Sequence, residues 1–160
     1  MKKILLLLMA IFAFGLQNVS AQDAPLKIVT GHPDLKVKIK RCVASGKTVV
    51  LDMTIINESD NDAQMRICMG NGDCTIHDCE GNEYSGGWGG PIVLKVAKNE
   101  PGQWVEGLTL ISGVPTNLKW TIKDVPNSVE SIARMQFRIE CQAWSLNEKV
   151  TIRNIPITRD

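Results

Sequence analysis

The sequence predicts an all-β protein, folded as an antiparallel β-sandwich of about eight or nine short strands. Two features support this fold class. Short segments carry an apolar residue at every second position, and Gly, Pro, Asn or Asp residues separate them. Only residues 128–135 place apolar side chains three apart, and this segment could form at most one turn of helix before a strand. Regularly spaced short strands favour a sandwich or barrel over alternating strand–helix units.

The first strands are expected to form a hairpin. In residues 35–43, LKVKIKRCV, apolar side chains alternate with lysines, and in residues 48–57, TVVLDMTIIN, they alternate with Asp52 and Thr54. The intervening ASGK is a turn that joins the two strands. After the polar turn NESDND, residues 65–69 repeat the period of two and predict a third strand.

The rest of the chain contains further short segments with strand character. They are residues 75–78, 83–85, 91–97, 103–111, 117–123, 133–144 and 149–157. The first two of these predict a small hairpin. Pro156 lacks the N–H that a strand ladder needs, so the last strand should end near it or lie at an edge. The apolar positions change parity around Asn154, which predicts a β-bulge there.

The N-terminus has the features of a secretory signal peptide. Two lysines precede an apolar run over residues 4–16, and a small-residue pattern ends at Ala21, which predicts removal of residues 1–21. The apolar run is too short for a transmembrane helix, which needs about 20 residues. We therefore expect a mature chain of residues 22–160 that forms one β-sandwich domain. It should be exported, to the periplasm or as a secreted protein, without membrane insertion.

The mature chain carries almost no net charge. Removing residues 1–21 leaves 16 basic and 17 acidic side chains, a formal charge of −1. The one concentrated basic run, Lys36, Lys38, Lys40 and Arg41, is expected to be the solvated face of a strand. Nucleic-acid binding needs a larger basic surface to displace counterions from phosphates, so we expect no nucleic-acid partner.

Four stretches of the sequence carry a resemblance to a protein family. They are ASGKTVVLDMTIINES at 44–59, HDCEGNEYS at 77–85, LISGVP at 110–115 and VTIRNIPI at 150–157. Together they resemble small exported immunoglobulin-like β-sandwich proteins of Bacteroidetes, whose signal peptides also often end in Ser-Ala-Gln. The resemblance implies an immunoglobulin-like β-sandwich and carries over no catalytic residue. The sequence departs from antibody domains because no Trp lies between Cys42 and Trp88.

The stretch CMGNGDCTIHDCEGN, residues 68–82, concentrates the side chains that could bind a metal. Cys68, Cys74, His77 and Cys79 could supply thiolate and imidazole ligands to a tetrahedral zinc ion. Structural zinc sites usually begin with two closely spaced cysteines, and the spacing here fits that pattern poorly. A zinc-binding module is therefore an alternative hypothesis, not the favoured one.

Disulfides explain the same cysteines better in an exported protein, because thiols are oxidised outside the cytoplasm. We expect two disulfides among Cys42, Cys68, Cys74 and Cys79, with the connectivity left open. Cys42 and Cys68 share strand parity with polar neighbours, so they should lie on outward faces. Cys141 shares parity with apolar neighbours and should be a buried free thiol, although a pairing that uses it stays open.

The sequence contains no recognisable catalytic motif. It lacks a Gly-x-Ser-x-Gly elbow, a His-Glu-x-x-His helix and a glycine-rich phosphate loop before a helix. A nucleophilic cysteine would need a nearby base, and His32 and His77 fit surface turn and strand positions better. We expect no enzyme activity and no cofactor, with a hydrolase of unrecognised motif as an alternative. A calcium site at Glu58, Asp60 and Asp62 lacks the EF-hand glycine and distal glutamate, so a solvated turn is favoured.

Trp88 is the candidate contact for a partner. It lies between glycines in SGGWGG, shortly after Tyr84, and an exposed aromatic residue on a loop suits contact with a sugar or a protein. Alternatively, Trp88 folds back and plugs one end of the sandwich. Trp120 shares a face with core residues, whereas Trp104 and Trp144 are expected to cover the rim. The favoured function is a non-enzymatic module that binds a protein or glycan through loops at one end.

Overall fold

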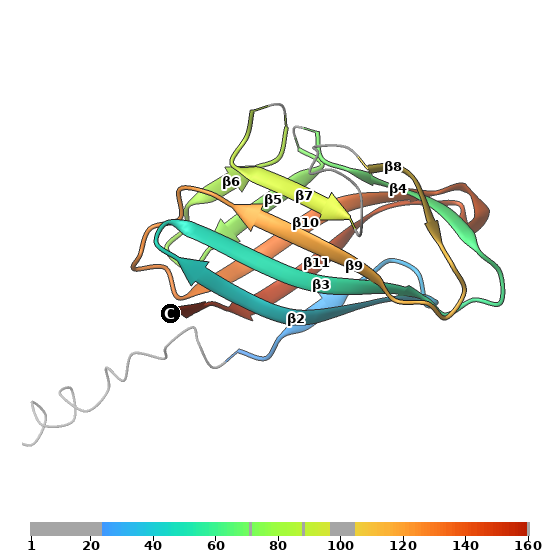
Figure 1. The fold of residues 1–160 in the computed structure, drawn as a ribbon, viewed down its shortest axis with the longest axis horizontal. Helices are drawn as coiled ribbons and strands as arrows, with labels where there is room; N and C mark the ends of the chain where they lie inside the picture. The colour runs from blue at the N-terminus through green and yellow to red at the C-terminus, as the bar shows by residue number, and fades with distance from the viewer. Residues whose placement is uncertain (1–23, 71, 88, 97–104, 160) are drawn as a thin grey trace, which may run out of the picture.

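The computed structural model describes residues 24–70, 72–87, 89–96 and 105–159. Within these ranges the chain forms twelve strands and one short 3₁₀ helix, and the strands make two sheets packed face to face (Figure 1). The fold is therefore an all-β sandwich, as the sequence predicts. The expected signal peptide and Trp88 lie outside the described residues. In the described part of the chain, no helix has the length and apolar character needed to cross a membrane.

One sheet has seven strands. Its main path runs β1, β11, β10, β4, β8, while β5 pairs with β10 and carries β6. The strands span Lys27–Val29 (β1), Ala63–Cys68 (β4), Cys74–Asp78 (β5), Glu83–Ser85 (β6), Val105–Leu110 (β8), Ser131–Cys141 (β10) and Leu146–Pro156 (β11). All neighbouring pairs are antiparallel. Because β4 and β5 pair with successive parts of β10, the cysteine-rich stretch 68–82 lies along this sheet.

The other sheet has five strands in the order β12, β2, β3, β9, β7. They span Leu35–Ser45 (β2), Thr48–Asn57 (β3), Ile92–Val96 (β7), Thr116–Ile122 (β9) and Thr158–Arg159 (β12). The pair of β2 and β3 is the hairpin that the sequence predicts. β12 runs parallel to β2, and the other pairs are antiparallel. Since β12 follows β11 after one residue, the chain crosses there from one sheet to the other.

The described residues contain more strands than the sequence predicts, because some strands are very short. β1 has three residues and β12 has two, too few for an alternating pattern to show. The helical turn considered for residues 128–135 is absent. Instead, Val129 donates its N–H to the carbonyl of Pro126 (3.2 Å) in a turn, and β10 follows. The 3₁₀ helix Gln142–Trp144 replaces the end of the strand predicted at 133–144.

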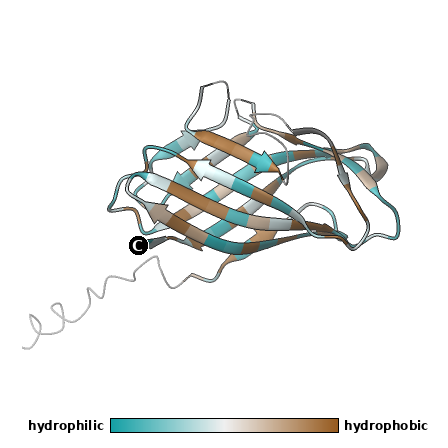
Figure 2. Ribbon diagram, in the orientation of Figure 1, coloured by the Kyte–Doolittle hydropathy of each residue, from teal (hydrophilic) through white to brown (hydrophobic). Residues whose placement is uncertain are grey.

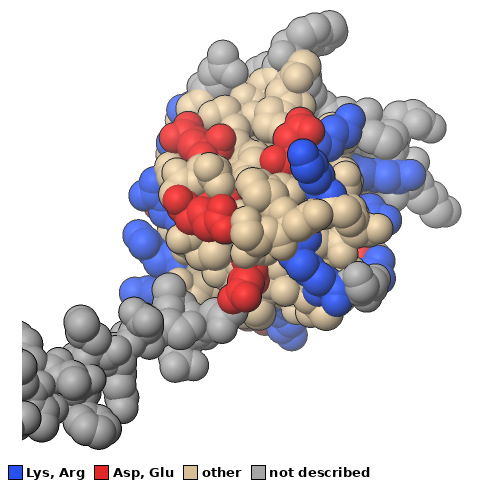
Figure 3. All heavy atoms as spheres, turned by 90° about the vertical axis from the view of Figure 1, so that its left-hand side faces the viewer, with Lys and Arg blue, Asp and Glu red and all other residues tan. Residues whose placement is uncertain are grey.

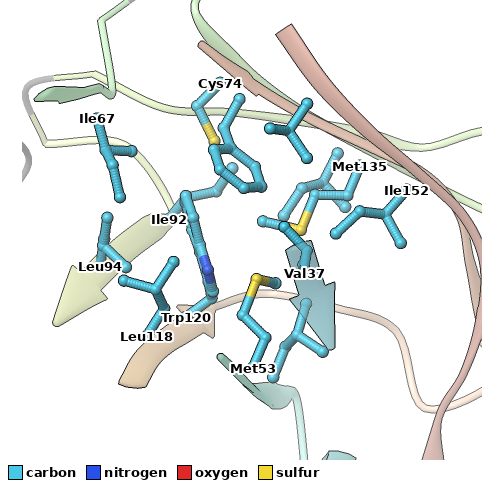
Figure 4. Packing of buried hydrophobic residues seen from close by; sticks show 14 of the residues in the cluster. Val37, Met53, Ile67, Cys74, Ile92, Leu94, Leu118, Trp120, Met135 and Ile152 are labelled. Atoms are coloured by element: carbon cyan, nitrogen blue, oxygen red, sulfur yellow. The ribbon is translucent and has the colours of Figure 1, made fainter. Parts of the chain in front are cut away.

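The core lies between the two sheets and is built from inward side chains of strands in both (Figure 4). Trp120 of β9 and Phe137 of β10 meet across it with ring centroids 5.0 Å apart, so an aromatic contact joins the sheets. Trp120 is fully buried, as its strand parity predicts. Hydrophobic and hydrophilic residues alternate along the strands in Figure 2, which puts the polar side chains on the outer faces.

A β-bulge in β2 changes which side chains face the core. The register against β3 shifts between Ile39 and Arg41, so the alternation that begins at Leu35 is interrupted. Beyond the bulge, Cys42 and Ala44 point inward and are buried. Uninterrupted alternation would have placed both on the outer face.

The parity change predicted near Asn154 is present in β11. Asn154 has a φ of +59°, in the left-handed region, and Ile152 and Ile155 are both buried on either side of it. The facing strand β10 changes parity at the same level, because Ile132 pairs with Ile155 and Met135 pairs with Ile152. The two strands therefore switch faces together and keep a common register.

Strand directions gather several connections at one end of the sandwich, which we call the loop end. β1, β3, β8 and β10 all run toward it. Their connections to the next strands are residues 30–34, 58–62, 111–115 and 142–145. β11 runs away from the loop end and ends at Pro156, as the missing N–H of proline predicts. Both ends of the described chain therefore lie at the far end from these loops (Figure 1).

Candidate functional site

A pocket of about 500 Å³ lies at the loop end, and we call it the loop-end pocket. It is formed by three connections that are distant in sequence: β1 to β2, β3 to β4 and β10 to β11. The lining residues are His32, Asp34, Ser59, Asn61, Asp62, Ala143, Trp144 and Ser145. Both sheets thus contribute to its walls, so the pocket depends on the packing of the whole sandwich.

An aromatic stack forms one wall of the loop-end pocket. The rings of His32 and Trp144 lie 4.5 Å apart between centroids, and their planes differ by 7°. Both residues are partly exposed. The 3₁₀ helix orients Trp144 and is closed by Ser145, which has a left-handed φ of 49°. His32 follows Gly31, whose φ of +73° is readily adopted by glycine.

Polar side chains form the rest of the pocket lining. Asp34 and Asp62 contribute carboxylates, Asn61 an amide and Ser59 a hydroxyl. The backbone N–H of Asp34 donates to Nδ1 of His32 (3.3 Å). Because Nδ1 accepts this hydrogen bond, the ring N–H of a neutral His32 lies at Nε2.

Asn57, at the end of β3, holds the loop end in shape. Its side chain is fully buried, and Nδ2 donates to the carbonyls of Asn61 (2.7 Å) and Leu110 (3.1 Å). Oδ1 accepts from the backbone N–H (3.0 Å) and the hydroxyl (2.6 Å) of Ser59. The backbone carbonyl of Asn57 accepts from the N–H of Gly113 (2.7 Å). One buried amide therefore fixes the β3–β4 connection against the β8–β9 connection, which preorganises the pocket.

The pocket suits non-covalent recognition of a polar ring. An aromatic face can stack on the apolar face of a sugar. Neighbouring carboxylate and amide oxygens can accept hydrogen bonds from sugar hydroxyls, and the hydroxyl of Ser59 and the amide of Asn61 can also donate. Small-molecule sites commonly combine an apolar wall with a few convergent polar groups in this way.

The cysteine-rich stretch does not form a metal site. Cys74 and His77 lie on β5 with opposite parity, so their side chains point to opposite faces of the sheet. Cys79 is exposed in the following turn, and Cys68 belongs to the preceding strand. Within residues 24–70, 72–87, 89–96 and 105–159, no three His, Cys, Asp or Glu side chains are placed to hold a metal ion. The zinc alternative therefore gains no support from the geometry.

All five cysteines are free thiols, so neither of the two expected disulfides is formed in the structure. Cys68 and Cys74 lie on opposite faces of their sheet by strand parity. Cys74 and Cys79 are separated by the rest of β5, about 13 Å at the usual rise per residue, whereas a disulfide needs Cα atoms within about 7 Å. Cys42 lies in the other sheet.

The outward position expected for Cys42 is wrong, whereas Cys68 has the outward parity expected of it. The bulge in β2 turns Cys42 into the core. Cys68 keeps its outward parity at the end of β4, yet it is only 3% exposed and lies beside Glu140 on the neighbouring strand. The expected burial of Cys141 as a free thiol is confirmed.

The buried thiols are poorly suited to nucleophilic catalysis. Burial raises the pKa of Cys42 and of Cys74 to about 12. Burial, together with the charge of Glu140 and its hydrogen bond, raises the pKa of Cys68 to about 11. Since the thiolate is the reactive form of cysteine, these three side chains stay protonated and unreactive near neutral pH.

The turn after β5 is built around Asp78. Its Oδ1 accepts the backbone N–H groups of Glu80 and Asn82 (both 2.9 Å), and its Oδ2 accepts the Asn82 amide (2.9 Å) and the Tyr84 hydroxyl (2.8 Å). Burial raises the pKa of Asp78, but these hydrogen bonds outweigh it and hold the pKa below its usual value. Burial and the bond to Asp78 raise the pKa of Tyr84. Tyr84, which the sequence suggests as a partner contact beside Trp88, is 7% exposed and braces this turn.

Comparison with known proteins identifies no family for this chain. No protein-family model matches it, and a search of curated proteins finds no match. The candidate contact Trp88 lies outside the described residues. The functional argument therefore rests on the geometry of the loop-end pocket.

Sequence reasoning misses the loop-end pocket as a site. It predicts Trp144 as a rim residue, His32 as an exposed turn residue and Asp62 as part of a solvated turn. A partial signal exists, because the predicted hairpin of residues 35–57 places His32 and Asp62 at the same end of its two strands. The sequence pattern does not reveal the 3₁₀ helix that brings the ring of Trp144 onto His32.

Proposed function

We propose that the protein is an exported, non-enzymatic β-sandwich that binds a glycan through the loop-end pocket. The observation that carries the proposal is the partly exposed stack of Trp144 on His32 beside the polar groups of Asp34 and Asn61. A sugar ring offers an apolar face for stacking and hydroxyls for the carboxylate and amide. The N-terminal signal-peptide pattern supports export.

The burial of the cysteine thiols and the hydrogen bonds of Asp78 support a binding function over a catalytic one. Cys42 and Cys74 are buried thiols with raised pKa values. Asp78, the carboxylate with a lowered pKa, uses both oxygens to hold a turn. These groups are buried or hold a turn, so they are not candidates for contact with a ligand.

A glycan array probed with the mature protein tests the proposal, followed by calorimetry on each hit. We expect Trp144→Ala to weaken glycan binding at least about tenfold, or about 1.4 kcal/mol, because the stacking surface is lost. His32→Ala should weaken binding in the same direction. Val29→Ala is the matched control, since Val29 is an exposed apolar residue on β1 outside the pocket.

Two results would contradict the glycan proposal. One is an array without a single reproducible hit. The other is a hit whose affinity is the same for the wild type and Trp144→Ala, with both proteins folded by circular dichroism. Either result would leave the aromatic stack without a ligand.

A protein partner is the second candidate, and a specific observation favours it. Ile111 and Val114 in the β8–β9 connection are large apolar residues that are 51% and 48% exposed. Their loop is tied to the pocket by Ser112, whose N–H donates to Oδ1 of Asp62 (2.9 Å). Apolar side chains beside a polar rim suit the centre of a protein interface. Ile111→Ala with Val114→Ala should weaken protein binding and leave glycan binding unchanged.

A further inference from the structure

The outer face of the five-stranded sheet concentrates basic side chains from separate strands. β2 contributes Lys38, Lys40 and Arg41, β9 contributes Lys119 and β7 contributes Lys95. Asp52 of β3 is the one acidic residue within the five strands of this sheet. We call the side chains of these five basic residues the basic face.

Strand pairing places like charges directly opposite each other on the basic face. Lys119 pairs with Lys95 on one side and with Asp52 on the other. Asp52 is engaged by Arg41, with 2.6 Å between Nε and Oδ2. Directly opposed like charges destabilise a sheet. The cross-strand pair of Lys95 and Lys119 is therefore repulsive, and Asp52 on the other side of Lys119 offsets part of this repulsion.

The lysines of the basic face lack acidic partners of their own. Lys40 donates to the side-chain oxygen of Asn117 (2.6 Å), which is neutral. Lys38, Lys95 and Lys119 make no ion pair with any residue that the structure describes. Their positive charge is therefore available to an external anion.

A hollow of about 610 Å³ lies on the basic face, and its lining includes Lys40, Lys95, Lys119, Asn117 and the Asp52 carboxylate that Arg41 engages. It reaches from β2 to β7, which are separated by β3 and β9. Three interstrand spacings amount to about 14 Å. This length suits several anionic groups on one extended molecule better than a single small anion, whose interaction with exposed lysines would be largely screened.

The opposite face of the sandwich also sets Arg134 opposite Arg153, but other arginines of that face have acidic partners. On the seven-stranded sheet, Arg138 contacts Asp73 (2.8 Å) and Arg66 contacts Glu140 (3.5 Å). In the end view of Figure 3, Lys and Arg side chains gather on both sides, with Asp and Glu between them. The two faces are thus both basic, but the five-stranded sheet has a single carboxylate to offset its lysines.

We propose that the basic face binds a linear anionic polysaccharide through its carboxylate or sulfate groups. The described strands of this face expose no aromatic side chain, because Trp120 points into the core. Single-stranded nucleic acid, whose bases stack on aromatic side chains, therefore fits the basic face poorly. A membrane surface would also call for apolar side chains that insert. The large exposed apolar residues of the described chain, Leu26, Val29, Ile111 and Val114, lie on other segments.

The test compares two variants that remove the same charge from opposite faces of the mature protein. Lys95→Ala with Lys119→Ala removes two cations from the basic face, and Arg134→Ala with Arg153→Ala removes two from the seven-stranded sheet. Binding is measured at low salt to dextran sulfate, to polygalacturonate and to neutral dextran. These probes separate sulfate, carboxylate and uncharged sugar recognition.

We expect the lysine variant to bind at least one of the two polyanions about tenfold more weakly than the wild type, and its binding to depend less on salt. The arginine variant should change affinity less than about twofold, and neutral dextran should not bind. The lysine variant should also melt at the same or a higher temperature, because it removes a repulsive pair. Trp144→Ala should leave polyanion binding unchanged, which separates this surface from the loop-end pocket.

Several results would overturn the inference. One is a wild type that binds neither polyanion at low salt. Another is an equal loss of affinity in the two double variants, which would show a non-specific charge effect. Single-stranded DNA of similar charge could bind more tightly than either polysaccharide and respond to the same lysines, which would assign the face to nucleic acid. If the alanine variant misfolds, Lys95→Gln with Lys119→Gln keeps the side-chain length and repeats the comparison.

Discussion

Asp78 is a buried carboxylate. Its oxygens accept hydrogen bonds from groups of its own turn instead of from water. Two backbone N–H groups, the Asn82 amide and the Tyr84 hydroxyl all donate to it. Bonds of this kind favour the charged form of a carboxyl group. The turn that follows β5 therefore depends on the ionisation of one side chain.

This dependence predicts a pH effect on stability. The pKa of folded Asp78 lies below its unfolded value near 4, so its contribution is complete above that value and is lost as the pH falls through the folded pKa. Asp78→Asn should lower the free energy of unfolding at pH 7 by about 1.5–3 kcal/mol. The difference from the wild type should shrink in urea denaturation as the pH falls below about 4 and through the lowered pKa of folded Asp78. A difference that stays constant with pH would contradict the ionised role.

The thiols predict a simple labelling pattern. Cys79 is exposed, whereas the other four cysteines are buried. Iodoacetamide at neutral pH should modify one thiol in the native protein and all five after unfolding without reductant, as measured by mass spectrometry. Cys79→Ser should abolish the native signal. Fewer than five modified thiols after unfolding would reveal a disulfide in the protein as isolated.

Single residues show where strand parity predicts burial and where it fails. Trp120 and Cys141 are buried as their parity predicts, because each lies in an uninterrupted run. Cys42 is misplaced by one inserted residue in β2, and the only trace of it in the sequence is Arg41 at a position that unbroken alternation would point inward. Tyr84 is buried because of a hydrogen bond to Asp78, and such a partner is visible only once the turn is folded.

At the scale of elements, two irregular positions decide which residues reach the core. The bulge in β2 brings Cys42 and Ala44 inward, and the left-handed Asn154 keeps Ile155 inward in β11. The second was predictable, since Ile155 has the wrong parity for a regular strand. The first also left a trace in the sequence, because unbroken alternation from Leu35 would point the charged Arg41 into the core.

Asn154 allows a matched test of this irregularity. Asn154→Gly and Asn154→Ala both remove the side-chain bond to the Pro25 carbonyl (3.0 Å), but only alanine is strained at a φ of +59°. Asn154→Ala should therefore be less stable than Asn154→Gly by about 1–2 kcal/mol. Chemical denaturation of the two variants measures the difference. Equal stabilities would mean that the strand relaxes to a regular conformation.

At the scale of the whole molecule, the two sheets share one core. Phe137 of the seven-stranded sheet and Trp120 of the five-stranded sheet are both fully buried and in contact. Neither sheet alone covers its inner face, so each depends on the other for burial of apolar surface. The sandwich should therefore unfold as a single cooperative unit.

Phe137→Ala tests this coupling. Loss of a buried aromatic side chain should lower the free energy of unfolding by about 3–5 kcal/mol. Tryptophan fluorescence and far-ultraviolet circular dichroism should report the same lower midpoint in urea, since both sheets lose their support together. Val29→Ala, at a half-exposed position, should change stability by about 0.5 kcal/mol or less. Separate transitions for the two probes would show that the sheets unfold independently.

The fold class was predictable because local alternation and turn residues specify strands. The order of strands within the sheets was not, since pairing depends on contacts between distant segments. The basic face illustrates the difference. Lys36, Lys38, Lys40 and Arg41 are visible as one run, but Lys95 and Lys119 join that surface only because β9 and β7 extend the sheet beyond β3. The loop-end pocket has the same origin, in loops that strand order brings together.

The two ends of the described chain lie at one end of the sandwich, and the loop-end pocket lies at the other. An attachment through residues before β1 or after β12 would point the loop-end pocket away from the support. Copies anchored in this way on a cell, a bead or a fusion partner would present their pockets outward and side by side. Weak single-site binding to a repetitive ligand could then add up to tight attachment through avidity.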